Sequence, residues 1–173
     1  TPNGVPPFDK IRLEHYEPAF LQGIEEQNAN IRAIVDNTEA PDFENVIVAF
    51  DNSSTHTQPG SAIFFNMTDA ETSDALNELS IKLAPVLSEH GDNISLNQAL
   101  FNKVQAVYQK KDSLNLTTEQ QKLLDKTYKD FVRSGANLSA EKQARLREIN
   151  KQLSTLASLS ATIIHERNNE FML

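Results

Sequence analysis

The pair His165-Glu166 comes nearest in this sequence to a metal-dependent catalytic motif. In zinc hydrolases with such a motif, two histidines four residues apart on a helix bind the metal, and the glutamate beside the first is the general base. The second histidine would stand at position 169, but that residue is Asn169. Asparagine is a poor zinc ligand, so we expect His165 to be a surface helix residue and predict no metal ligands.

The other three histidines are separated along the chain. His15 stands at a predicted helix entrance and is expected to cap or pack there. His56 lies in a polar loop. His90 is expected in the last turn of a helix, where a cation interacts favourably with the helix dipole.

Other kinds of catalytic site find little support. The chain has no cysteine, which excludes disulfides, thiolate catalysis and cysteine-ligated zinc. It has no glycine-rich phosphate loop, and nothing local in the sequence suggests a serine nucleophile with a histidine and an acid arranged around it. We therefore predict no catalytic, cofactor-binding or metal-binding residue in this chain.

The charge balance narrows the range of partners. The formal net charge is −8, and the longest basic cluster, Lys110-Lys111, is followed at once by Asp112. Nucleic-acid binding requires a clustered basic surface, which this pattern does not provide. No apolar run approaches the roughly 20 residues that span a bilayer. Neither a nucleic acid nor a membrane is an expected partner.

Helices are the elements that would have to position any functional residue. Apolar residues recur every three or four positions, and only five glycines occur in 173 residues. These features predict an all-α fold of about six antiparallel helices in stacked helical hairpins, with the last helix longest. Residues 1–14, with prolines at 2, 6 and 7, predict an extended N-terminal arm, and residues 15–173 one helical domain.

Two helices have boundaries that prolines and glycines predict. We expect the first helix from Pro18 to Val35, because proline suits a first helical position. We expect the third from Ser73 to His90, ended by Gly91 and kinked at Pro85.

Local capping signals mark the other helices. N-caps are expected at Asp42, Asn97 and Ser139, and a capping box over Thr117–Gln120. A helix is expected to end at Gly135. The second helix is expected to break over residues 51–60 and to resume over 61–66. The last helix carries an apolar stripe of Leu146, Ile149, Leu153, Leu156 and Ile163.

From Pro6 to about Thr155 the chain resembles a known family. The residues that carry the resemblance are Pro7–Ile11, His15–Phe20, Ala40–Ile47, Phe64–Thr68, Asp92–Asn97, Phe131–Leu138 and Arg145–Asn150. In this order they resemble the N-terminal part of the thimet-oligopeptidase-like zinc metallopeptidases. The branch most similar is that of the bacterial peptidyl-dipeptidases, or dipeptidyl carboxypeptidases.

The resemblance implies a much longer parent enzyme. Members of the family are mainly helical, with two halves enclosing a deep channel that admits short peptides. Their zinc site, a His-Glu-x-x-His helix with a downstream glutamate, lies in the C-terminal half, and none of its residues maps onto this chain. By resemblance, zinc is the parent's cofactor, the C-terminal catalytic half is this chain's partner, and short peptides are the substrates.

One departure from the family pattern concerns the second helix. The family-like pattern carries one helix through residues 43–66, whereas residues 53–60 contain helix-breaking types. The chain also begins at Thr1 and stops on an apolar run, so we expect both ends to be cuts in a larger chain. The missing initiator methionine and the family branch favour the periplasm over the cytoplasm.

Three interpretations remain open. In the first, the chain is a channel-wall segment of a peptidyl-dipeptidase, active only within its parent. In the second, it is a stand-alone helical module that binds peptides or a protein, and an exposed apolar stripe on the last helix would fit either of these. In the third, it is a small hydrolase whose site assembles from dispersed residues.

Overall fold

The structure, a computed structural model, describes residues 10–54, 63–66 and 73–171. Throughout these ranges the regular elements are helices and none is a strand, so the predicted all-α class is confirmed. In chain order the elements are α1 (Leu13–Asp36), the π-helical η2 (Phe43–Val48), α2 (Ala49–Asn52), α4 (Asp74–Ser95), α5 (Gln98–Gln109), the 3-10 turn η3 (Lys111–Ser113), α6 (Thr118–Arg133) and α7 (Ala140–Phe171). Residues 63–66 form one further helical turn.

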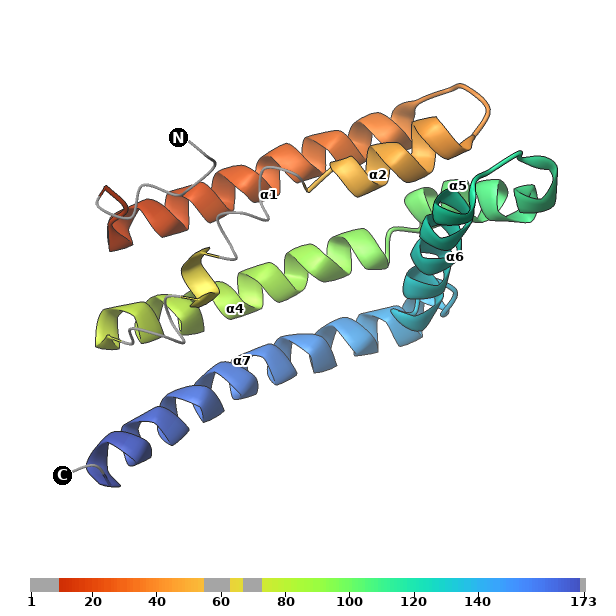
Figure 1. Ribbon diagram of the computed structural model, residues 1–173. Coiled ribbons are helices and arrows are strands. Elements are labelled where there is room, and N and C mark those ends of the chain that lie inside the picture. The colour runs from red at the N-terminus through yellow and green to blue at the C-terminus, as the bar shows by residue number, and fades with distance from the viewer. Residues whose placement is uncertain (1–9, 55–62, 67–72, 172–173) are drawn as a thin grey trace.

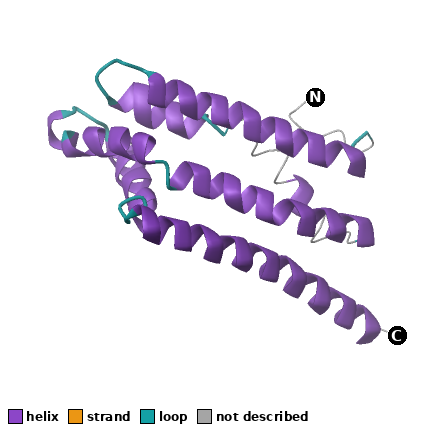
Figure 2. Cartoon of the chain, turned by 180° about the vertical axis from the view of Figure 1, so that it is seen from behind, coloured by secondary structure: helices purple, strands orange, loops and turns teal. Residues whose placement is uncertain are grey.

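Three long helices lie side by side in a row, with α4 between α1 and α7 (Figures 1 and 2). The helices α5 and α6 lie at one end of this row. In the row, α1 and α4 run in the same direction. Two contacts show this, since Glu17 pairs with Lys82 and, further along both helices, Gln27 pairs with His90. In contrast, α4 and α7 run in opposite directions (Figure 1). The expectation of stacked antiparallel hairpins throughout stays a prediction.

The first helix begins earlier than predicted. It starts at Leu13, not Pro18, and Arg12 occupies the N-cap position. The backbone N–H of Arg12 donates to Nδ1 of His15 over 3.2 Å, which confirms the capping role expected of that histidine. Pro18 has no N–H to bond the carbonyl of Glu14, but Glu14 is exposed, so water can satisfy that carbonyl.

The helix α4 ends later than predicted. It continues through Pro85 and past Gly91 to Ser95, so Gly91 is an interior residue and not the terminator. A glycine costs a helix about 1 kcal/mol relative to alanine, a penalty that packing of the following residues can exceed. Here the extra turn carries buried Asp92 and leads into Leu96, which is also buried. The kink expected at Pro85 stays a prediction.

The remaining local signals agree with the structure. Side-chain oxygens of three predicted cap residues, Asp42, Asn97 and Thr117, accept a hydrogen bond from the backbone N–H three positions on. Ser73, where the third helix was expected to start, caps α4 in the same way. Gly135 has φ of +94° after α6, as expected for a glycine at a helix end. The break after the second helix begins at Ser53, the residue that follows α2, whereas residues 55–62 lie outside the described part.

Two clusters of buried side chains hold the helices together. The larger joins α1, η2, α5 and α6, and its largest fully buried members are Ile47, Val46, Leu100, Val104, Val107 and Leu124. The smaller joins α1 and α4 through Phe20, Phe64 and Leu83. Within it the Phe64 ring meets those of Tyr16 and Phe20 edge to face, with centroids 5.0 and 5.3 Å apart.

Candidate functional site

The helix that carries the His165-Glu166 pair is present as predicted. His165 and Asn169 both lie within α7, although only the backbone is described there. Among the side chains that the structure describes, no group of three or more histidine, cysteine, aspartate or glutamate residues is arranged to hold a metal ion. The described residues therefore offer no ligand set for a catalytic zinc.

His90 lies between α1 and α4 in a polar cluster. Its Nε2 is 2.8 Å from Oε1 of Gln27, and the Gln27 amide donates to Oγ of Ser53 over 3.4 Å. Since that amide oxygen can only accept, the His90 Nε2 carries the proton. Its Nδ1 is then a buried acceptor with no hydrogen-bond partner, and burial lowers the pKa of the imidazole.

The prediction for His90 was partly wrong. We expected it in the last turn of its helix, where a positive charge is favourable, but α4 continues five residues beyond it. The desolvated position favours the neutral ring instead. Residues 27, 53 and 90 are distant in sequence, so no local spacing could have predicted that they meet.

This cluster does not form a nucleophilic site. Ser53 is only 5% exposed, and Gln27 separates its hydroxyl from the His90 ring. The imidazole therefore cannot take the serine proton directly, as a general base must. Asn30 also donates to the Ser53 carbonyl over 3.1 Å, so the cluster joins α1 to the end of α2 and to α4.

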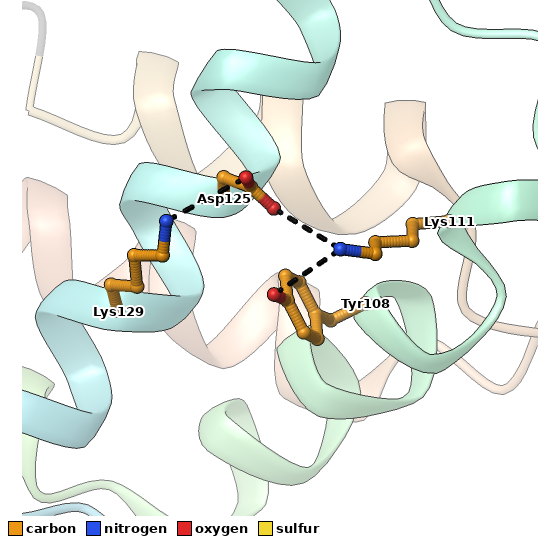
Figure 3. A network of polar contacts seen from close by, with 4 residues as sticks. All are labelled: Tyr108, Lys111, Asp125 and Lys129. Atoms are coloured by element: carbon orange, nitrogen blue, oxygen red, sulfur yellow. Dashed lines mark hydrogen bonds and ion pairs between the residues drawn. The ribbon is translucent and has the colours of Figure 1, made fainter.

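A second polar network lies where α5 approaches α6 (Figure 3). Asp125 is 3.7 Å from the ammonium groups of both Lys111 and Lys129. The Lys111 ammonium also donates to the Tyr108 hydroxyl over 3.4 Å and lies 4.7 Å from that ring's centroid. The hydrogen bond to Tyr108, followed by the charges of Tyr108 and Asp125, raises the pKa of Lys111. A lysine held protonated in this way cannot act as a general base.

Two hydrogen bonds between polar side chains join α4 to α7. Asp92, 7% exposed, accepts a hydrogen bond from Asn150 over 2.7 Å, and Arg147 donates to Asn93 over 2.8 Å. A hollow of about 390 Å³ beside these residues is lined by Glu89, Glu148 and Lys151 among others. These bonds position α7 along α4.

The predicted apolar stripe of α7 is largely exposed. Leu146 is half-buried, but Ile149, Leu153, Leu156 and Ile163 are 37%, 58%, 61% and 54% exposed. The exposed set also includes Leu159 and Ile164, at 41% and 59%. We call these six exposed residues, from Ile149 to Ile164, the α7 apolar face.

The chain is similar to bacterial dipeptidyl carboxypeptidases. It is 39% identical over 157 residues to the Salmonella typhimurium dipeptidyl carboxypeptidase, and 38% identical over 154 residues to that of Escherichia coli. Oligopeptidase A of Haemophilus influenzae is 28% identical over 157 residues. No family model matches the chain.

These similarities confirm the resemblance found in the sequence. They cover 89–91% of this chain but only 23% of each relative. The chain thus spans about a quarter of the length of the relatives that it matches. The part of this chain that matches these peptidases is mainly helical where the structure describes it.

Proposed function

We propose that this chain is the N-terminal helical segment of a zinc-dependent peptidyl-dipeptidase and forms part of the wall of its substrate channel. The observation that carries the proposal is the similarity to two dipeptidyl carboxypeptidases over nine tenths of the chain and about a quarter of theirs. The chemistry is then performed elsewhere in the longer protein.

The side chains support a positioning role for this segment. The described histidines serve structural purposes: the His15 ring caps α1, and the His90 ring joins α4 to α1. The carboxylate of Asp92 holds Asn150 of α7. In the longer protein, zinc bound in the C-terminal half would polarise the scissile carbonyl and activate water. This segment would shape the route by which short peptides reach that metal.

The test compares the full polypeptide that the gene encodes with the 173-residue chain. The full polypeptide should release C-terminal dipeptides from short N-blocked peptides, lose this activity with a chelator, and leave folded proteins intact. The 173-residue chain should hydrolyse none of them. Metal-dependent cleavage by the purified 173-residue chain would contradict the proposal, and so would an inactive full polypeptide that binds zinc.

A stand-alone binding module is the second candidate, favoured by the exposed α7 apolar face. Intact mass compared with the open reading frame separates the two. A reading frame that ends at Leu173 would support the module, whereas one of peptidase length would support the segment. For the parent we propose a periplasmic location, which fractionation of the source cells would test.

A further inference from the structure

The α7 apolar face is the largest group of exposed large apolar side chains among the described residues. Its six members, Ile149, Leu153, Leu156, Leu159, Ile163 and Ile164, are between 37% and 61% exposed. The other large apolar residues that are exposed, such as Leu21 on α1 and Val86 on α4, are fewer and are distributed over other parts of the described fold. Contiguous exposed apolar surface of this kind marks a contact site, whereas isolated residues need no explanation.

The position of α7 leaves this face without a partner in the described fold. In both views α7 is the outer helix of the row, with α4 on one side only (Figures 1 and 2). The residues that bond to α4 are Arg147 and Asn150. At about 100° per residue, the centre of the apolar face lies roughly 150° around the helix from these residues and their half-buried neighbours. The face therefore points away from α4.

The breadth of the face indicates what covers it. From Leu159 round to Ile164 it occupies an arc of about 140°, and it extends for about 22 Å along the axis. A two-helix coiled coil buries a narrower seam, bordered by charged residues that pair across it. The positions that border this seam include Leu159, Ala157 and Ile164, which carry no charge. An arc wider than about 100° is typical of a helix that faces a protein core.

We infer that the α7 apolar face is the surface on which the rest of the longer polypeptide packs. This inference rests on the proposed function, since it takes the relatives' unmatched three quarters as the source of the partner. The partner surface is apolar and belongs to the same chain, downstream of Leu173. In this arrangement α7 changes from the edge of the row into an interior helix between α4 and that downstream part.

Cysteine labelling of the full polypeptide tests the contact. The segment has no cysteine of its own, so L153C and L156C each introduce one thiol into it. L21C is the matched control, because Leu21 is 48% exposed on a different helix. A maleimide reagent is added to each native variant, the labelled peptide is identified by mass spectrometry, and circular dichroism verifies folding.

In the native full polypeptide, L153C and L156C should label at least tenfold more slowly than L21C. In denaturant all three should label at the same rate. Equal native rates would overturn the inference. Protection that disappears on dilution would also overturn it, because a second copy would then be the occupant.

Activity is measured separately on the same samples. Protected sites in a protein that lacks peptidyl-dipeptidase activity would support the packing surface and refute the proposed function. An active protein in which L153C and L156C label as fast as L21C would support the proposed function and refute the packing surface. A reading frame that ends at Leu173 would refute both.

Discussion

Two glycines allow one substitution to be tested in opposite environments. Gly135 has φ of +94°, a conformation that residues with a Cβ seldom adopt. Gly91 lies inside α4, and a Cβ built on it meets no atom within 4 Å. The change from glycine to alanine should therefore destabilise the chain at position 135 and stabilise it at position 91.

The structure sets the size of each effect. At Gly135 the backbone strain of alanine costs about 1–2 kcal/mol. The new methyl would also lie 2.9 Å from the tips of Leu138 and Leu146, which are flexible enough to move aside at a small further cost. The reduced entropy of the unfolded chain offsets about 0.4–1 kcal/mol of this, which leaves a net loss of about 1 kcal/mol. Gly91→Ala should gain about 0.5–1 kcal/mol, because alanine suits a helix interior better.

Urea and thermal unfolding, followed by the helical circular dichroism signal, measure both variants against the parent chain. Their free energies of unfolding should differ from each other by about 2 kcal/mol. For a chain of this size, each kcal/mol corresponds to a shift of about 2–4 °C in Tm. If both variants shifted in the same direction, the role assigned to the left-handed glycine after α6 would be refuted.

Three further predictions use the same unfolding assay. Because burial lowers the His90 pKa, the folded chain resists protonation more than the unfolded chain does. The free energy of unfolding should therefore fall as the pH drops from 7.5 towards 5, and His90→Gln should flatten this part of the curve; an unchanged curve would contradict the neutral assignment. Removing the capping oxygen in Thr117→Ala should cost about 1 kcal/mol, and a loss below measurement would show that the capping box contributes little. Leu124 is 1% exposed, so Leu124→Ala should lower the free energy of unfolding by about 2–5 kcal/mol. The surface control Leu21→Ala should lower it by less than about 0.5 kcal/mol. Similar losses for the two variants would contradict the assignment of Leu124 to the core.

The family resemblance was available from the sequence, but the polar clusters were not. The matched stretches follow one another in a fixed order, and the comparisons confirm their similarity to peptidases. In contrast, Gln27, Ser53 and His90 meet only because α1, α2 and α4 pack together. Contacts between such distant positions leave no periodic signal in a single sequence.

The local chemistry of the chain determined its helical class and most of its helix ends. Asp42, Asn97 and Thr117 cap their helices through bonds that span three residues, and Gly135 supplies a positive φ that other residues resist. Such interactions form within one turn, so the sequence alone specifies them.

Tertiary packing determined the structure at the positions where local preferences were weak. The cost of Gly91 within a helix is about 1 kcal/mol, and α4 continues past it to Asp92, which bonds to Asn150 of α7. The apolar stripe of α7 was visible in the sequence, but only the structure shows that the opposite, polar side meets α4. The physical reason is that helical periodicity defines the faces of a helix, whereas the neighbouring helices determine which face is covered.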